Sequence, residues 1–371
     1  MGQRRPPAWA GRLHKLQSSL RAQSLDAFVV STPHNVRYLT GFAGSTSLVV
    51  VVPSAVFLVS DGRYAFAVQE ALGTGTIGPV TFELVDRRYD LTLASLLARQ
   101  GVVRAAFEAG HVTVATLSGW QRAAPAIEWV STERVVESAR AIKDAGEVAI
   151  FRRAGALLAS VAGRLRDAVV PGRQEIAVAE VIDKMIIAAG FSRPAFETIV
   201  ASGPNSAHPH ARPTERRLTG GDLVVLDFGG VLDGYCVDLT RMAAVGAITS
   251  EAAALFAAVR DAHAAALGAV RPGVETSAID AAARQVLEAQ GLGEAFMHST
   301  GHGLGLEVHE GPRIARAGLD APEAVEVNMI FTIEPGAYVE HVGGVRLEDD
   351  VLVTAEGGEV LTAGSRDLLV V

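Results

Sequence analysis

Two Asp, one His and two Glu residues lie in or beside apolar runs that are typical of β-strands. They are Asp227, Asp238, His302, Glu334 and Glu348. Burying a carboxylate among Val, Leu and Phe costs free energy unless a positive charge compensates it. Four carboxylates and one imidazole therefore predict a pair of divalent metal ions. Two metals held by shared carboxylates activate water and polarise a carbonyl, which indicates hydrolysis of an amide.

The spacing of the four acids fits two β-hairpins. Asp238 follows Asp227 by eleven positions, and Glu348 follows Glu334 by fourteen, with a glycine-containing turn in each interval. Hairpins of this size can bring both of their carboxylates onto one face. Three neighbouring acids are instead expected to be solvated or in salt bridges: Asp233, Asp349 and Asp350.

The histidines near these acids differ in their surroundings. His302 lies between two glycines, which let the backbone approach closely and the ring project freely, so it is the predicted metal ligand. His309 and His210 are predicted to hydrogen-bond the substrate or to stabilise an oxyanion. His208, beside Pro209, is expected at the surface.

Motifs of other enzyme classes do not occur in the sequence. There is no H-E-x-x-H zinc motif and no P-loop, and the glycines around His302 do not have the G-x-G-x-x-G spacing. The single cysteine, Cys236, lies in a strand-like run and is expected to pack rather than to react. One cysteine allows no internal disulfide.

The composition is that of a folded, acidic protein. Its 371 residues are 49% hydrophobic and 20% charged, with a net charge of -8, and the length suits two domains. The negative charge argues against a nucleic-acid partner. No apolar run is long enough to span a bilayer, and no secretory signal is recognisable, so we expect a cytoplasmic protein that does not bind membranes.

The first third of the chain alternates predicted strands and helices, which indicates a small α/β domain. Residues 12–23 have the apolar spacing of an amphipathic helix, and residues 27–30, 48–52 and 56–60 are predicted strands. Residues 35–42 combine polar and aromatic side chains and are expected to form a loop.

A domain boundary is predicted near residue 142. Asp144 and Glu147 have the spacing of a capping box, which predicts the start of a long helix that continues to about residue 170. Residues 1–142 and 143–371 are therefore the two expected domains.

After this boundary the chain repeats itself. Each copy has a helix, a Pro-Gly stop, a second helix, a segment with histidines and then strands that carry two acids. The prolines of the two stops, Pro171 and Pro272, are each followed nineteen residues later by a glycine. The pattern predicts two α+β half-domains related by a pseudo-two-fold axis, with the metals at the seam between them.

These motifs resemble metallopeptidase family M24, whose catalytic domain has the pita-bread fold. The likeness is carried by Asp227 in LDFGG, Asp238 in GYCVDLTR, His302 in STGHGLGLEVHEGP, Glu334 in FTIEPG and Glu348 in GVRLEDD. The segments PHNVRYLTGF and SDGRY are similar to the α/β domain that precedes the catalytic domain in creatinase. Over its whole length the chain resembles the branch of Xaa-Pro aminopeptidases and Xaa-Pro dipeptidases, the latter also called prolidases.

The resemblance implies a role for each of the five ligands. Asp227 would bind one metal, His302 and Glu334 would bind the other, and Asp238 and Glu348 would bridge the two. Glu334 would also act as the proton shuttle. The ions would be divalent, with Mn²⁺ preferred and Zn²⁺ or Co²⁺ possible.

Further residues take roles through the same resemblance. His210 and His309 would face the substrate, and Arg346 would support the carboxylate of Glu348. In relatives the N-terminal domain helps to form dimers and covers the active site. Arg37 or Tyr38 is therefore expected to reach the pocket of the neighbouring subunit in a homodimer.

The implied substrate is a peptide with proline at its second position, cleaved before the proline. We favour an Xaa-Pro aminopeptidase, because no insertion in the catalytic half is long enough to wall off the cleft. The alternative is an Xaa-Pro dipeptidase in which a cation, with Arg37 as the candidate, binds the proline carboxylate. A remote alternative is a non-catalytic pita-bread module that binds peptides. Such modules typically lose metal ligands, whereas this chain has all five.

Overall fold

The computed structural model describes residues 9–319 and 321–371. The chain divides into two compact units, of which the first ends at Arg140 and the second begins at Ala141. Each unit has its own sheets and its own buried apolar side chains. No helix within the described ranges combines the length and the hydropathy needed to cross a membrane.

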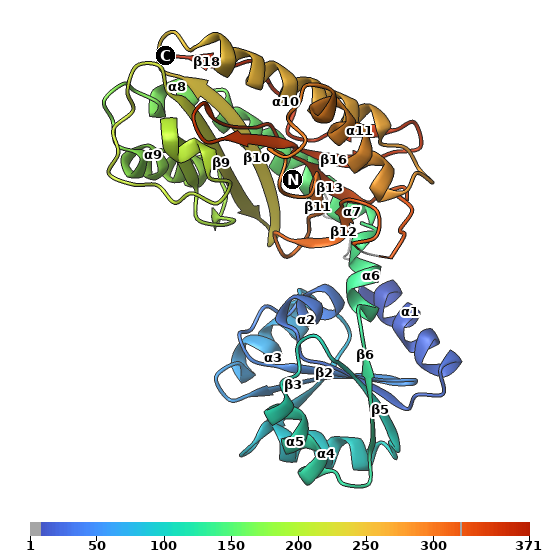
Figure 1. Ribbon diagram of the computed structural model, residues 1–371. Helices are drawn as coiled ribbons and strands as arrows, with labels where there is room; N and C mark the ends of the chain where they lie inside the picture. The colour runs from blue at the N-terminus through green and yellow to red at the C-terminus, as the bar shows by residue number, and fades with distance from the viewer. Residues whose placement is uncertain (1–8, 320) are drawn as a thin grey trace. The chain divides into compact units, whose positions relative to one another are not determined.

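The N-terminal unit is an α/β structure built on one six-stranded sheet (Figure 1). Its strand order is β4-β3-β2-β1-β5-β6, and β2 is antiparallel to both of its neighbours while the other pairs are parallel. The strands are β1 (Ala27–Val30), β2 (Leu48–Val52), β3 (Ala55–Asp61), β4 (Thr81–Val85), β5 (Arg104–Glu108) and β6 (Glu128–Thr132). The helices are α1 (Trp9–Ala22), α2 (Pro33–Thr40), α3 (Ala65–Thr74), α4 (Tyr89–Arg99), α5 (Val114–Ala123) and α6 (Val135–Ala141), which reaches the boundary.

The amphipathic helix and the strands predicted for this unit are confirmed. The apolar stripe of α1, formed by Leu13, Leu16 and Leu20, is buried. Because β1 and β2 are covered on both faces, all of their residues are buried, and both read as continuous apolar runs in the sequence.

The loop predicted over residues 35–42 is wrong, because most of it belongs to helix α2. Pro33 occupies the first turn, where its missing N–H is no loss and its fixed φ suits a helix. The carboxylate of Glu108, on β5, accepts hydrogen bonds from the backbone N–H groups of Ser31 and Thr32 at 2.6 and 2.8 Å. A helix start that is stabilised from another strand leaves no local signal in the sequence.

The C-terminal unit consists of two halves with the same order of elements. The first half contains α7 (Ala145–Ala162), α8 (Leu165–Ala168), α9 (Glu175–Ala188), β7 (Arg193–Pro194), β8 (Ile199–Ser202), the 3-10 helix η1 (Gly203–Ala207), β9 (Leu223–Leu232) and β10 (Tyr235–Ala244). The second contains α10 (Ser250–Ala269), α11 (Thr276–Ala289), β11 (Gly301–Gly303), β12 (Glu310–Ile314), β13 (Ile330–Ile333), β14 (Gly336–Val339), β15 (Gly343–Arg346), β16 (Asp349–Val353) and β17 (Gly358–Val360), and β18 (Leu369–Val370) returns to pair with β10.

Equivalent contacts in the two halves confirm the predicted repeat. Both Pro-Gly stops have their glycine in the left-handed region, with φ of 80° at Gly172 and 84° at Gly273. The N–H of Gly172 donates to the carbonyl of Leu218, and the N–H of Gly273 donates to that of Val325. The helix before the first stop is shorter than predicted, since α7 ends at Ala162 and the separate α8 follows.

Two hairpins carry the four acids, as the spacing predicts. In the antiparallel pair β9–β10, Asp227 lies opposite Thr240 and Asp238 lies opposite Gly229, which puts the two acids on one face. In the pair β13–β16 the last matched residues are Ile333 and Asp349. Glu334 follows Ile333 directly in the chain, and Glu348 directly precedes Asp349. The neighbouring pair β14–β15 keeps the same register up to the turn.

The capping box predicted at the start of α7 is present. The side chain of Asp144 accepts from the N–H groups of Gly146 and Glu147, and Glu147 accepts from the N–H of Asp144. These contacts satisfy backbone donors that the helix cannot satisfy internally.

We expect Asp144→Ala to lower the free energy of unfolding by about 1 kcal/mol, because it removes this cap. In a unit of this size the loss corresponds to a fall in Tm of about 2–4 °C. Thermal unfolding followed by circular dichroism measures it. The control is Asp261→Ala in the exposed part of α10, whose carboxylate pairs with its exposed neighbour Arg260. Equal Tm values for the two variants would contradict the role of the cap.

Candidate metal centre and active site

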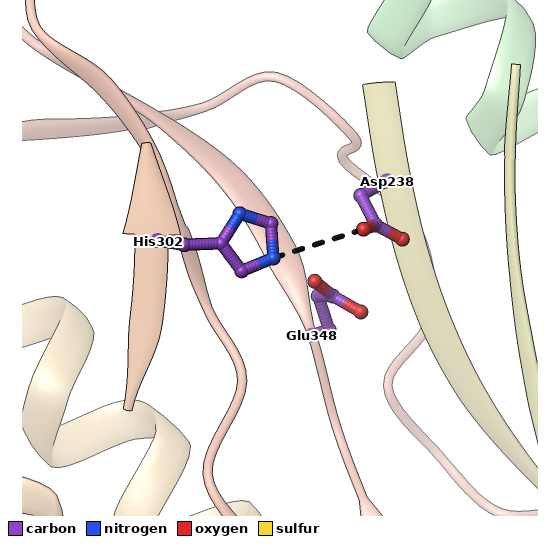
Figure 2. A group of neighbouring side chains, drawn as sticks. All are labelled: Asp238, His302 and Glu348. Atoms are coloured by element: carbon purple, nitrogen blue, oxygen red, sulfur yellow. Dashed lines mark ion pairs between the residues drawn. The ribbon is translucent and has the colours of Figure 1, made fainter. Parts of the chain in front are cut away.

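Three side chains from both halves point toward one another at the seam (Figure 2). Asp238 comes from β10, His302 from β11, and Glu348 from the residue that precedes β16. One potential ligand atom from each lies within 4.8 Å of the others. The Nε2 atom of His302 is 3.9 Å from Oδ2 of Asp238. This is the geometry of groups that can share a metal ion.

Asp227 and Glu334 complete the predicted set. Both line the same cavity as the first three residues. Oε1 of Glu334 is 3.4 Å from Nε2 of His302, and the carboxylate of Asp227 pairs with Arg346. The structure thus brings all five sequence-predicted ligands to one cavity.

The electrostatics of the cluster favour a bound cation. Burial, followed by repulsion from Glu348, raises the pKa of Asp238 well above its usual value. Burial also raises the pKa of Glu348, with further repulsion from Glu334, and burial raises that of Glu334. Oδ1 of Asp227 and Oε1 of Glu348 are buried without a hydrogen-bond partner among the described residues. Divalent ions would supply both the missing charge and the missing contacts.

His302 is held in the state that a metal ligand requires. Its Nδ1 lies 3.1 Å from the carbonyl oxygen of its neighbour Gly303, so Nδ1 carries the proton and Nε2 keeps its lone pair toward the acids. Burial lowers the pKa of the ring, which keeps it neutral. A Cβ at position 301 or 303 would collide with backbone atoms of neighbouring strands, so the flanking glycines are required for close packing.

Arg346 contacts a different acid from the one expected. Its guanidinium pairs with Asp227 instead of lying directly beside Glu348. It reaches Glu348 through Thr240, whose hydroxyl accepts from Nε of Arg346 at 3.2 Å and donates to Oε2 of Glu348 at 2.6 Å. Thr240 is fully buried on β10, directly opposite Asp227. One arginine therefore links acids from both halves.

A second chain of hydrogen bonds leads from Arg346 to a histidine that the sequence analysis missed. The hydroxyl of Tyr338 accepts from Arg346 at 2.8 Å and donates to Nε2 of His298 at 3.0 Å. Nδ1 of His298 donates to the carbonyl of Ser299. Burial lowers the pKa of His298 and so favours the neutral ring. Its position four residues before His302, in the same glycine-rich run, is the signal that could have found it.

A buried ion pair on α11 holds the segment that carries His298. Arg284 donates to the carbonyl oxygens of Phe296 and His298, both at 3.1 Å, and forms a paired contact with Asp280 at 2.9 Å. Asp280 in turn accepts from the N–H and the hydroxyl of Thr300. The carbonyl of Thr300 accepts from the N–H of Glu334, so this helix fixes both sides of the site.

The cavity has a volume of about 750 Å³ and is lined by both predicted substrate-facing histidines. His309 is exposed at its wall, with its ring centroid 4.2 Å from that of His302. His210 is exposed on the segment after η1. His208 is exposed as well but does not line the cavity, in agreement with its predicted surface position.

Arg37 and Tyr38 lie in α2 of the N-terminal unit. Tyr38 is only 5% exposed, and its hydroxyl donates to the carbonyl of Ala139 in the same unit. The guanidinium of Arg12 lies over its ring, 3.9 Å from the centroid. Arg37 is partly buried. These two contacts of Tyr38 belong to the packing of its own unit.

The three acids set aside in the sequence analysis have different surroundings. Asp233 pairs with Arg153 near the surface, as expected. Asp349 is fully buried and pairs with Arg241 and Arg366. Although burial opposes it, the contact with His263, followed by the charges of the two arginines, lowers the pKa of Asp349. Asp350 was expected to be solvated or in a salt bridge, but it is fully buried, accepts from the N–H of Asp238 at 3.1 Å and forms no salt bridge with the residues that the structure describes. Strand alternation explains the difference between these last two neighbours.

The comparisons with known proteins agree with this geometry. The model of "Metallopeptidase family M24" matches residues 149–355, and that of "Creatinase/Prolidase N-terminal domain" matches residues 12–142. The chain belongs to metallopeptidase family M24. It is therefore a hydrolase that acts on peptides with the help of bound metal.

Relatives of this M24 chain match it over nearly its whole length. It is 31% identical over 361 residues to "Xaa-Pro dipeptidase" of Pyrococcus furiosus, which covers 96% of the chain and 99% of the relative. The solved "Xaa-Pro dipeptidase from Bacillus anthracis" has a TM-score of 0.93 and 30% identity and covers 98% of this chain and 100% of that one. The solved "X-Pro aminopeptidase from Thermotoga maritima MSB8" has a TM-score of 0.86 and 29% identity, with 95% and 100% covered.

We expect metal binding to release protons. Burial and repulsion raise the pKa values of Asp238, Glu334 and Glu348, so the metal-free protein retains protons on this cluster at higher pH than free carboxyls do. A bound cation favours the ionised forms, so about one to two protons should leave per filled centre. Affinity for the metal should accordingly fall as the pH is lowered.

Calorimetric titration of metal-stripped protein with Mn²⁺, in buffers of different ionisation enthalpy, counts these protons. Asp238→Asn has one titrating group fewer and should release fewer protons than the wild type. Glu180→Gln, at an exposed position on α9, is the matched control and should leave the count unchanged. Binding without proton release at neutral pH would contradict the raised pKa values.

Proposed function

We propose that this M24 peptidase hydrolyses the peptide bond between an N-terminal residue and a following proline, with two divalent metal ions. The observation that carries the proposal is the set of four carboxylates and one imidazole that line a single cavity at the seam of the repeat. The similarity to proteins named Xaa-Pro dipeptidase and X-Pro aminopeptidase supports the preference for proline. Proline lacks an amide N–H, so sites that bind this N–H suit it poorly and a dedicated enzyme is expected.

The proposed ligands divide between the two halves of the unit. Asp227 would hold one ion, His302 and Glu334 the other, and Asp238 and Glu348 would be shared. A set so rich in oxygen suits Mn²⁺ well and leaves Zn²⁺ and Co²⁺ possible. When bound, the ions supply an activated water and polarise the carbonyl of the scissile bond.

The chain's own residues would orient the substrate and move its protons. Glu334, half-buried at the cavity wall, would pass a proton to the nitrogen of the leaving proline. The raised pKa of this carboxyl suits the role, since it favours the protonated form that can give up a proton. His309 and His210 would donate hydrogen bonds to the substrate carbonyl as negative charge develops on it.

One arginine of the cavity lining is placed to bind the carboxylate of a dipeptide, which supports the dipeptidase alternative. Arg313 on β12 lines the cavity and lies directly opposite His302 in the pair β11–β12. It is exposed, so a substrate carboxylate in the cavity can reach its guanidinium. The carboxylate that ends an Xaa-Pro dipeptide lies one residue beyond the scissile bond. We therefore propose Arg313, in place of Arg37, as the residue that binds it.

The second candidate function is an Xaa-Pro aminopeptidase that accepts longer peptides. The exposed side chain of Met297, at 62% of its full accessibility, belongs to the cavity lining and favours this alternative, because an exposed wall leaves room for further residues. The likeness to the Thermotoga maritima aminopeptidase also supports it. Both candidates share the metal centre and differ in what lies beyond the proline.

We expect metal-stripped protein to cleave Ala-Pro only after Mn²⁺ is added, because the bound ions would supply the activated water. His302→Ala and Glu334→Ala should each lower kcat by at least about 10³-fold. Release of alanine, followed by chromatography, measures the rates, and Glu180→Gln is the control. Activity that persists in both variants would contradict the metal centre. A folded protein that binds Mn²⁺ but cleaves neither Ala-Pro nor Ala-Pro-Ala-Ala would indicate a peptide-binding module.

We expect Arg313→Met to lower kcat/KM for Ala-Pro by about 10- to 100-fold, mainly through KM, because it removes a charge-assisted hydrogen bond to the substrate carboxylate. Ala-Pro amide, which lacks that carboxylate, is the matched substrate control and should lose much less. The same loss on both substrates would contradict the assignment. Efficient cleavage of Ala-Pro-Ala-Ala by wild-type protein, unaffected by Arg313→Met, would favour the aminopeptidase.

A further inference from the structure

Glu175, the first residue of α9, is a buried acid outside the metal cluster. It is fully buried, and its two carboxylate oxygens accept hydrogen bonds from three separate residues. Oε1 accepts from the N–H and the hydroxyl of Ser202 at 2.7 and 2.6 Å. Oε2 accepts from the N–H and the hydroxyl of Thr214 at 3.0 and 2.6 Å, and the amide of Asn205 donates to both oxygens at 3.1 Å.

These partners bracket the segment that carries His210. Ser202 ends β8 and Thr214 lies twelve residues later, so one carboxylate joins the two ends of a stretch that leaves the sheet and returns. Between them, residues 209–213 line the cavity, His210 among them. Closing a loop of this length costs conformational entropy, and a set of strong contacts at its base offsets that cost.

The far part of the segment is tied to the metal centre itself. Arg346, which pairs with Asp227, also donates to the carbonyl of Pro209 at 3.2 Å. The N–H of Gly344 donates to the hydroxyl of Ser206 at 2.9 Å. His210 is therefore held from two sides. Glu175 joins the two ends of the segment, and the hydrogen bond from Arg346 fixes Pro209, the residue next to His210.

The second half of the unit contains the same kind of arrangement. On α11, the helix equivalent to α9, Asp280 accepts from both the N–H and the hydroxyl of Thr300, as Glu175 does from Ser202. Each half thus uses a buried carboxylate on its second helix to fix a segment that lines the cavity. The use of one device twice indicates that it serves the site at the seam.

We propose that Glu175 is a positioning residue for His210, and that it fixes the 202–214 segment so that the imidazole can reach the substrate. The inference rests on the proposed function, because that function gives His210 its role at the substrate. A carboxylate suits the position because all of its oxygen lone pairs can accept, and every group that faces it donates. A glutamine there would present an NH2 group to these donors and could keep only part of the contacts.

The test is a double-mutant cycle with Glu175→Gln and His210→Ala, measured on Ala-Pro with the Mn²⁺-loaded enzyme. Misplacement of His210 should lower kcat about tenfold in Glu175→Gln with little change in KM. In the His210→Ala background the same substitution should change kcat less than about twofold, because its target is gone. Glu180→Gln, on the exposed side of the same helix, is the matched control and should leave kcat unchanged.

Two further measurements separate positioning from a loss of folding. Thr214→Val removes only one hydroxyl contact and should produce a smaller fall in kcat with the same dependence on His210. Amide hydrogen exchange of peptides that cover residues 203–214 should speed up in Glu175→Gln while exchange in β9 and the Mn²⁺ content stay unchanged.

The outcomes distinguish this inference from the proposed function. If Glu175→Gln lowers kcat equally in the wild-type and His210→Ala backgrounds, the positioning role is overturned while the role of His210 stays intact. Unchanged kcat in a folded Glu175→Gln protein would have the same meaning. Unchanged kcat in His210→Ala would contradict the proposed role of His210 and this inference together. Loss of Mn²⁺ in Glu175→Gln would also overturn the positioning role, since Glu175 would then act on the metal centre as a whole.

Discussion

The concentration of negative charge at the seam is the constraint on which the rest of the catalytic unit depends. Asp227, Asp238, Glu334 and Glu348 line one cavity, and a single guanidinium, that of Arg346, makes a direct ion pair with one of them. Burial and repulsion raise the pKa values of Asp238, Glu334 and Glu348, so these carboxyls hold protons more readily than exposed ones do. The centre is therefore a site whose electrostatics are completed by the cations that a metallopeptidase binds.

The internal repeat is a structural solution to this constraint. One half of the unit could present only two acids on a hairpin, and the opposing half supplies the other two together with the imidazole. Contacts that cross the seam then fix the distance between the hairpins: the hydroxyl of Thr240 on β10 donates to Glu348, and the N–H of Asp238 donates to Asp350. Metal affinity and the packing of the two halves are consequently coupled, since both depend on the same contacts.

The sequence predicted what is local or periodic and missed what depends on distant partners. The hairpins, the capping box at Asp144 and the repeat have fixed spacings, so they could be read from the chain. Helix α2 could not, because Glu108 on another strand stabilises its start. The partner of Arg346 and the hydrogen bond from Tyr338 to His298 are also decided by tertiary packing. Spacing identifies the residues that could form the site, whereas the hydrogen bonds that orient them come from other elements.

The three consecutive acids at positions 348–350 illustrate how the fold assigns different roles to chemically similar neighbours. Glu348 faces the cavity, while Asp349 points the other way into a cluster with Arg241 and Arg366, where its pKa is lowered. Arg241 also donates to the carbonyl of Glu348 at 2.6 Å, so the ion pairs behind the strand hold the backbone of the residue in front of it. On one face of the strand two arginines pair with Asp349, whereas on the other face the carboxylate of Glu348 meets Arg346 only through the hydroxyl of Thr240 and faces the cavity. The positions of the arginines therefore decide, together with the positions of the acids, which carboxylate faces the cavity without a direct ion pair to arginine.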